Sequence, residues 1–427
     1  MAGYGGGNKQ STDELITVDV TKTNYVRMKK NIFFYFIFAA ICSSCTENPN
    51  RVNFTINPND RKIVFPVQLN DSITVNMTFD TGCDDRAISL DSSFVASHLS
   101  LVPDASPDTS QVGSAWADYR TLNLAYNIPQ TVKVGNTSLI YNGLQILNWK
   151  KALQTNDSEG ILNIPQNDTT NVWEWNFKHN YLEIHPAKNF QMPKNCFLFP
   201  MQDRGCNPLI QIPLQIQCAN GDTLTINRTF FVDMGMPFDI AIMYPCKEWE
   251  FFDKRDDAVW TSYMDSYFRH HAITATLFDN VTMDAIRIYT FDNPHSVESK
   301  YIIGINFLKR FNVFIDRKNW QLGLQPIKNF QRIVNPLGRR FHYSAPKNSE
   351  GKYIVTKIAD YKDNYYKTAG LQEGDEIIAI NDKLLKDITH EESREFYKKD
   401  ILVLDIIRDG ESLKIVVPVD KNEKQGD

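Results

Sequence analysis

From Ile63 onward, short apolar runs alternate with turns rich in Asn, Asp, Gly and Pro. This pattern is typical of an all-β region, because short strands need frequent tight turns. Part of the pattern occurs twice in the same order. The repeated strand pairs are residues 63–69 with 75–82, and residues 209–214 with 229–235. We therefore expect two related β halves, over residues 62–200 and 201–330.

Each half continues with the same series of landmarks, which makes chance similarity a poor explanation. Every landmark of the first half has a counterpart in the second. The pairs are Asp80-Thr81-Gly82 and Asp233-Met234-Gly235, apolar runs 87–90 and 239–242, Gly160-Ile161 and Gly304-Ile305, and hairpins 175–184 and 311–324.

An apolar run ending in Asp-Thr-Gly, followed downstream by an apolar Gly-Ile segment, resembles the pepsin/retropepsin superfamily of aspartic proteases. The resemblance covers about residues 63–326. It implies a mainly β fold with two lobes, each an acid-protease-like β-barrel. It also implies a catalytic pair, Asp80 and Asp233, with one aspartate from each lobe, and loops supported by Thr81, Gly82 and Gly235.

Peptide hydrolysis explains why two such loops are needed. Two carboxylates held close together cannot both ionise, so they share a proton, and one can act as base while the other acts as acid. The family has Thr or Ser after each aspartate, whose hydroxyl braces the opposite loop. Thr81 fits this pattern, but a thioether is at best a weak acceptor, so Met234 does not. The pair is then loosely held, or the second lobe is degenerate. Each aspartate could also only cap a turn.

Two further segments of this region carry expectations. Residues 111–127 are the candidate for a flap hairpin, with Trp116 and Tyr119 near its tip; an ordinary half-exposed hairpin is the alternative. Residues 248–271 combine charged and aromatic positions and predict an amphipathic helix inserted between strands. His270 and His271 are adjacent rather than four residues apart, so they do not indicate a metal site. We expect neither a metal nor an organic cofactor.

After a linker at residues 331–340 the pattern changes. We expect a strand at 352–358, a helix at 389–398, and a hairpin whose strands, 401–407 and 413–419, are joined by Asp409-Gly410. The run 369–381, Ala-Gly-Leu-Gln-Glu-Gly-Asp-Glu-Ile-Ile-Ala-Ile-Asn, resembles a bacterial PDZ domain over residues 341–420.

The PDZ resemblance implies an α/β domain with a partly open barrel, followed by a tail at 421–427. An extended peptide would add to it as a strand beside Tyr353, Ile354, Val355 and Thr356. The carboxylate-binding loop of such domains is not recognisable here. A free C-terminus, an internal peptide and a partner strand therefore remain open as ligands, and so does a role as a spacer only.

The N-terminal region reads as an export signal. Met28-Lys29-Lys30 precedes an apolar run at 32–41, which is shorter than the roughly 20 residues of a membrane span and fits a secretory signal. Ser43-Ser44-Cys45 resembles a bacterial lipobox, so residues 28–45 are expected to be a lipoprotein signal with Cys45 lipidated. Cleavage at Cys42 and a buried strand are the weaker alternatives.

The flanks of this signal carry two expectations. Residues 1–27 would be a gene-call extension, and residues 46–61 a tether to the membrane. We therefore expect a protein anchored by lipid in the bacterial cell envelope, on its periplasmic or outer-membrane face.

The composition and the absence of certain motifs limit the classes of partner and function that we expect. Lys and Arg number 46 and Asp and Glu 51, so the net charge is −5 and gives no reason to expect nucleic acid. A serine peptidase is excluded because neither Gly-x-Ser-x-Gly nor Gly-Asn-Ser-Gly-Gly occurs. Two hypotheses remain: an exported aspartic endopeptidase acting on peptides or unfolded protein, or a decayed protease scaffold that only binds peptides or protein partners. The internal repeat favours a monomer.

Overall fold

The computed structural model describes residues 48–57, 62–113, 120–148, 158–203, 208–218, 221–255, 259–263, 266–277, 281–291, 300–331, 342–358, 364–389, 392, 395–396 and 399–418. Residue contacts divide the chain into two compact units, Met1–Pro49 and Asn50–Asp427. The architecture below belongs to the second unit. The predicted signal peptide with Cys45, the residues before it, and Trp116 and Tyr119 lie outside the described residues.

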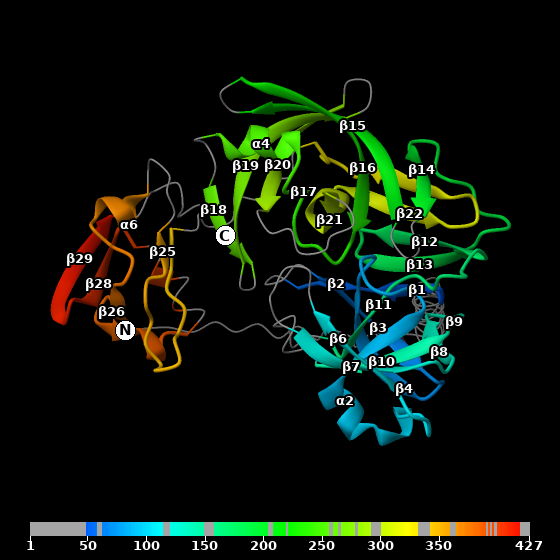
Figure 1. Cartoon of the computed structure of the whole chain (residues 1–427). Helices are drawn as coiled ribbons and strands as arrows, with labels where there is room; N and C mark the ends of the chain where they lie inside the picture. The colour runs from blue at the N-terminus through cyan, green and yellow to red at the C-terminus, as the bar shows by residue number, and fades with distance from the viewer. Residues whose placement is uncertain are drawn as a thin grey trace, which may run out of the picture. The chain divides into compact units, whose positions relative to one another are not determined.

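The fold is mainly β, as the turn-rich pattern predicts (Figure 1). The described helices are short, and none of them is long and apolar enough to cross a membrane. They are α2 (Ser92–Ser97), α4 (Lys247–Asp253), α5 (Ile305–Leu308) and α6 (Tyr365–Thr368), with 3-10 turns η1 (Leu99–Leu101) and η2 (Leu385–Asp387).

A ten-stranded sheet contains most of the first half. Its order is β6-β7-β10-β5-β11-β4-β3-β8-β9, and β2 pairs with β3 outside this path. The strands are β2 (Thr55–Ile56), β3 (Ile63–Leu69), β4 (Ile73–Phe79), β5 (Ala87–Asp91), β6 (Asp108–Gly113), β7 (Arg120–Tyr126), β8 (Gln130–Val134), β9 (Thr137–Tyr141), β10 (Gly143–Leu147) and β11 (Gly160–Leu162).

A thirteen-stranded sheet contains the second half and the closing hairpins of both halves. Its order is β1-β13-β12-β22-β23-β14-β15-β16-β21-β17-β20-β19-β18. The strands are β1 (Arg51–Asn53), β12 (Asn171–Asn176), β13 (Tyr181–Pro186), β14 (Phe197–Asp203), β15 (Pro208–Cys218), β16 (Thr223–Asp233), β17 (Ile240–Met243), β18 (Val259–Tyr263), β19 (Ser266–Leu277), β20 (Val281–Phe291), β21 (Tyr301–Gly304), β22 (Phe311–Asp316) and β23 (Gln321–Pro326).

The repeat seen in the sequence reappears in the strand pairing. In the first half, β11 runs parallel to β4 and antiparallel to β5, and β10 runs parallel to β5. In the second half, β21 runs parallel to β16 and antiparallel to β17, and β20 runs parallel to β17. Each aspartate of the repeated motif thus stands at the end of a strand that is paired on both sides, because β3 and β15 flank β4 and β16.

The expected barrels are not found. Among the described strands, the smaller sheet ends on β6 and β9 and the larger on β1 and β18, so neither sheet closes on itself. An extra pairing of β15 with β19 folds part of the larger sheet back, but its two edge strands stay free. The strand sequence alone does not fix whether the ends of a sheet meet, because closure depends on tilt and register.

The closing hairpins of the two halves join in the larger sheet, where β12 pairs with β22. Both predicted hairpins are present, as β12–β13 and β22–β23, and their aromatic residues support the first motif. Trp175 on β12 is fully buried, and its ring centroid lies 4.1 Å from that of Phe79, the last residue of β4. Burial of large aromatic rings gives this region much of its packing energy, so Phe79 anchors the residue that follows it.

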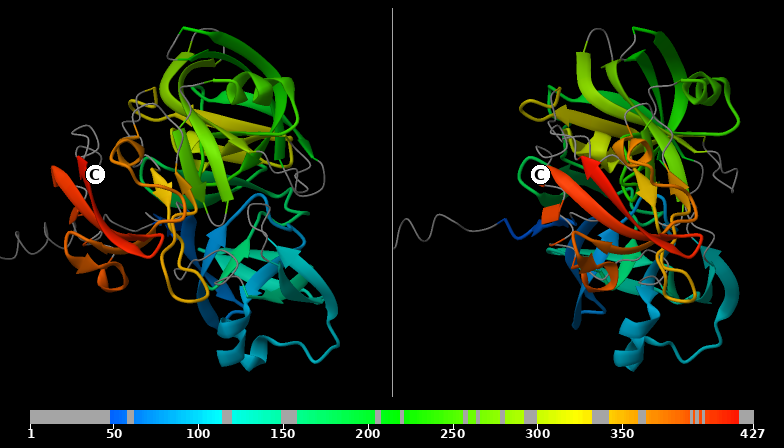
Figure 2. Two further views of the ribbon diagram at one scale, coloured as in Figure 1. Left: turned by 60° about the vertical axis from the view of Figure 1, so that its left-hand side comes forward. Right: turned by 90° about the vertical axis from the view of Figure 1, so that its left-hand side faces the viewer.

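The C-terminal region has its own core and two small sheets. β24 (Tyr343–Ser344) pairs with β25 (Lys357–Ile358), and β27-β26-β28-β29 form the other sheet, with β26 (Glu376–Ile380), β27 (Lys383–Leu384), β28 (Ile401–Arg408) and β29 (Glu411–Pro418). The predicted hairpin is confirmed as β28 and β29, whose side-by-side course is visible in Figure 2. Its turn residues Asp409 and Gly410 both have positive φ, which an Asp-Gly turn tolerates.

Three expectations about elements were wrong. Residues 352–358 do not form one strand: they contain β25 and two isolated bridges, because Val355 N bonds to Asp375 O while Thr356 N bonds to Ser344 O. Of the described residues between 248 and 271, only those of α4 are helical, since the β-branched and aromatic run after it forms β18 and β19. The predicted tether contains β1 and β2, which pair with β13 and β3.

Candidate active site

Asp80 lies directly after β4 and is held by the backbone on two sides. Its N–H donates to Leu162 O at 3.0 Å, which continues the pairing with β11. Its Oδ1 accepts the Gly82 N–H at 2.6 Å. Asp80 is partly exposed as a residue, and these bonds fix its position at the end of the strand.

Asp233 is the last residue of β16 and lies in a matching loop. Its Oδ1 accepts the Gly235 N–H at 2.9 Å, the same bond that Gly82 makes to Asp80. Asp233 is buried, with 7% of its surface exposed. The two loops therefore present their carboxylates in equivalent ways, and the aspartate of the second is the less exposed.

The two loops meet, and the predicted pair is brought together. The carboxyl groups of Asp80 and Asp233 lie close enough to influence each other's ionisation. A Cβ placed on Gly235 would lie 2.2 Å from Cγ of Asp80, and one on Gly82 would lie 3.2 Å from Oδ2 of Asp233. Each carboxylate thus rests against the glycine of the opposite loop, and a side chain at Gly235 would occupy its place.

This arrangement raises the pKa of both aspartates. Removal from water is the largest cause for each, and for Asp233 the nearby negative charge of Asp80 adds to it, so the pKa of Asp233 lies well above its ordinary value. The pKa of Asp80 is raised by a smaller amount, because the Gly82 N–H and the charge of Lys62 favour its ionised form. The pair therefore holds one proton over a range of pH, and that proton resides mainly on Asp233.

The hydroxyl of Thr81, on the loop of Asp80, bonds to the backbone of the loop of Asp233. This buried hydroxyl donates to Val232 O at 2.7 Å and accepts the Met234 N–H at 2.8 Å. The side chain of Met234 is fully buried in the hydrophobic core, and has no hydroxyl to return these bonds to the loop of Asp80. The bracing expected from both loops is thus present in one direction.

Asn163 supports the first loop, although the sequence analysis assigned it no role. It is fully buried, and its Nδ2 donates to Thr81 O at 3.2 Å and to Cys83 O at 3.0 Å. Asn306, at the matching place after Gly304-Ile305, donates to Pro237 O at 2.7 Å. In the sequence, an Asn follows Gly-Ile in both halves, one residue later in the first half. This repetition was the signal that could have identified both asparagines.

A buried arginine also faces an aspartate beyond each motif. Arg317 Nη1 lies 3.1 Å from Asp85 Oδ2 and donates to Pro165 O at 2.9 Å. In the second half, Arg310 Nη2 lies 4.0 Å from Asp239 Oδ1. The first pair links the second half of the chain to the loop of Asp80, so it helps to hold the two motifs in register.

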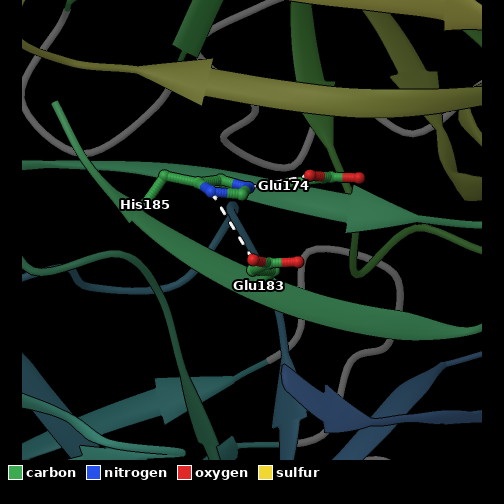
Figure 3. A group of neighbouring side chains, drawn as sticks. All are labelled: Glu174, Glu183 and His185. Carbon is green, nitrogen blue, oxygen red and sulfur yellow. Dashed lines mark hydrogen bonds and ion pairs between the residues drawn. The ribbon is translucent and has the colours of Figure 1, made fainter. Parts of the chain in front are cut away.

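Within the described part of the chain, one group of side chains has ligand atoms close enough for a metal ion, all within 4.8 Å: Glu174, Glu183 and His185. Figure 3 shows the imidazole of His185 between the two carboxylates, with Nε2 2.7 Å from Glu174 and Nδ1 3.7 Å from Glu183. Glu183 also binds Arg51 Nε at 2.7 Å. The Arg51 guanidinium and the His185 imidazole thus already interact with these carboxylates, so the group is a polar network between β1, β12 and β13.

Hydrogen bonding in this network lowers the pKa of Glu174. Burial raises the pKa of Glu174, but bonds from His185 and Asn176 outweigh it and leave that pKa below its ordinary value. The ionised carboxylate is therefore the stabilised form, as in a structural ion pair.

The other predicted sites are the flap of the first half and the peptide-binding strand of the C-terminal region. The strands of the proposed flap are confirmed as the hairpin β6 and β7, paired from Asp108 with Ala125 to Gly113 with Arg120. In the C-terminal region, Tyr353 and Ile354 make isolated bridges, Val355 is buried and Thr356 is exposed. These four residues do not form the continuous strand edge that peptide addition would use.

Comparison with models of known protein families finds no match, and neither does comparison with curated proteins. The function must therefore be argued from the site itself.

Proposed function

We propose that the protein is an aspartic endopeptidase with two pseudo-equivalent lobes, whose catalytic residues are Asp80 and Asp233. The observation that carries the proposal is the closely spaced carboxyl pair, in which each carboxylate is held by the glycine N–H of its own loop and rests against the glycine of the opposite loop. Pairs of titratable groups whose pKa values differ are typical of acid–base catalysis.

The chemistry follows from the shared proton. The ionised aspartate takes a proton from a water molecule while the water oxygen bonds to the carbonyl carbon of the peptide. The protonated aspartate gives its proton to the carbonyl oxygen. The C–N bond then breaks as the aspartate that took the water proton gives it to the nitrogen, while the other aspartate takes a proton from a hydroxyl of the tetrahedral intermediate. The products are a carboxylic acid and an amine, and the pair returns to its starting protonation. The reaction needs no cofactor.

The setting of this activity belongs to the same proposal. The protein would be exported and anchored by lipid at Cys45 in the bacterial cell envelope, and would act as a monomer on peptides or unfolded protein. The C-terminal region would be a PDZ-like module that holds extended polypeptide. Its separate core and its β28–β29 hairpin support an independent module.

Met234 favours a second candidate, a decayed protease scaffold that only binds peptides. It leaves Thr81 as the one motif residue whose hydroxyl braces the two loops. A methionine this deeply buried is a core residue in the place of a functional hydroxyl. Retention of both aspartates and both glycines favours the enzyme.

The test is hydrolysis of unfolded casein from acid to neutral pH. Asp80→Asn and Asp233→Asn are expected to abolish cleavage, while the control Asp84→Asn, on the same loop as Asp80, keeps it. Circular dichroism checks folding. Cleavage by wild type that survives both changes would reject the dyad. Cleavage by Met234→Thr alone would identify a decayed enzyme.

A further inference from the structure

Lys62 is a buried cation close to the carboxyl pair, and the sequence analysis assigned it no role. Only 4% of its surface is exposed, and its Nζ is out of contact with solvent. Lysine is seldom buried so completely, because removing its charge from water is costly without a compensating partner. Its position therefore calls for a nearby negative charge.

The strand register supplies that charge. Ile63 of β3 lies opposite Phe79 of β4, so the next residues outward, Lys62 and Asp80, face each other across the antiparallel pair. Residues directly opposite in such a pair project to the same side of the sheet, with Cβ atoms about 5 Å apart. Lys62 O accepts the Asn57 N–H at 3.0 Å, which fixes the backbone just before β3.

The charge of Lys62 acts on one aspartate. It favours the ionised form of Asp80, and is not among the main influences on Asp233, whose proton is retained by burial and by the charge of Asp80. The other charged groups of this loop face elsewhere: Asp84 binds Arg86 at 3.0 Å and Asp85 binds Arg317 at 3.1 Å. The Cys83 thiol donates to Asp80 O at 3.1 Å and leaves the carboxylate free of it.

We propose that Lys62 is a positioning residue for the dyad: its buried charge keeps the negative charge of the pair on Asp80, so that Asp80 takes the proton of the attacking water and Asp233 supplies the proton to the carbonyl oxygen. This inference deepens the proposed function and rests on it for its catalytic meaning. The electrostatic part concerns two carboxyls and one ammonium group, and can be measured without catalysis.

The experiment is a carboxyl ¹³C NMR titration of the full chain with labelled aspartate, assigned with Asp80→Asn and Asp233→Asn. In wild type, Asp80 is expected to titrate below Asp233. Lys62→Met is expected to raise the pKa of Asp80 by about one unit, the effect of one charge at short range in a protein interior. Lys62→Arg keeps the charge and should keep the wild-type titration. Lys133→Met, on β8 of the same sheet, is the control for loss of a lysine.

The pH profile of casein hydrolysis provides the second measurement. Its acid limb, which reports ionisation of the base, is expected to move upward by about one unit in Lys62→Met and to stay in place in Lys62→Arg and Lys133→Met. Lys62→Gln serves if Lys62→Met does not fold.

The two measurements separate the two proposals. An NMR shift without cleavage by wild type would support the influence of Lys62 on Asp80 and reject the enzyme. Cleavage by wild type with an unchanged Asp80 titration in Lys62→Met, or a wild-type titration in which Asp233 ionises first, would overturn the role of Lys62 and leave the enzyme.

Discussion

The loops that carry Asp80 and Asp233 are built alike and supported differently. Both follow a strand paired on two sides, and in both the glycine N–H binds the aspartate. The first loop has Thr81, whose hydroxyl reaches the opposite loop, and Lys62 beside its carboxylate. The second has Met234, buried in the core. Backbone geometry thus repeats, while the polar interactions that decide charge and bracing come mainly from the first half.

The glycines give the sharpest test of this comparison. Gly235→Ala would place a Cβ 2.2–2.5 Å from the Asp80 carboxylate, whereas Gly82→Ala would place one 2.9 Å from Asp80 and 3.2 Å from Asp233. Displacing a reacting group by about 1 Å can cost about 100-fold. We expect Gly235→Ala to lose at least that much casein hydrolysis, and Gly82→Ala to lose less.

Both glycine variants should keep the wild-type circular dichroism spectrum, since the change is confined to the loops. Equal losses in the two variants would mean that the carboxylates are not packed against the loops as described.

The second largest effect is expected at the two buried ion pairs, which should differ in how much they stabilise the fold. Asp85→Asn would leave the buried Arg317 without the carboxylate at 3.1 Å, whereas Asp239→Asn would remove one at 4.0 Å from Arg310. Breaking a buried pair by removing one partner costs about 3–5 kcal/mol. We expect a loss in this range for Asp85→Asn in urea unfolding, and about 1 kcal/mol for Asp239→Asn, where the guanidinium also donates to Asp284 O.

For Asp85, the double change Asp85→Asn with Arg317→Met removes the unpaired charge and should recover part of the stability. No recovery would show that the two groups do not interact.

Thr81 allows the cross-link itself to be measured. Thr81→Val keeps the shape and removes the hydroxyl, so Val232 O loses its donor and the Met234 N–H loses its acceptor. Two buried bonds at about 1 kcal/mol each predict a loss of about 2 kcal/mol in the free energy of unfolding. Thr81→Ser, which retains the hydroxyl, is the matched control and should lose less. An equal loss in both variants would assign the effect to packing.

Much of the strand framework could be predicted, because it depends on local signals. Alternating apolar positions and turn residues gave the hairpins β12–β13, β22–β23 and β28–β29 within a few residues. The repeated Asp-x-Gly motif identified Asp80 and Asp233 before any geometry was known, and the structure brings them together.

The errors have a common physical origin in tertiary context. Residues 259–263 and 266–277 form β18 and β19 because neighbouring strands offer partners, which the charged and aromatic composition does not reveal. Lys62 and Arg317 could not be linked to the site from the sequence, since Lys62 reaches Asp80 through strand register and Arg317 reaches Asp85 over more than two hundred residues. The prediction that the sheets close into barrels was wrong for the same reason, because closure depends on how distant strands pair.

The acid dependence of stability should distinguish Asp233 from Asp84, which lies on the loop of Asp80. At low pH both carboxyls are protonated in the folded and unfolded states. As the pH rises above the ordinary aspartate pKa of 3.8, Asp233 ionises when unfolded but keeps its proton when folded, because its folded pKa is raised. Wild type should therefore lose stability relative to Asp233→Asn, by about 1.4 kcal/mol per pH unit until that raised pKa is passed.

Asp84 should give the opposite slope. Burial raises its pKa, but bonds from Arg86 outweigh this and lower it, so the stability that Asp84 contributes is present above 3.8 and lost as the pH falls. Thermal unfolding of wild type, Asp233→Asn and Asp84→Asn from pH 3 to neutrality measures both slopes, and the Asp84 effect should be the smaller because its partner is exposed. Parallel curves for the two variants would mean that Asp233 titrates as an ordinary surface carboxylate, which its burial between the two loops does not allow.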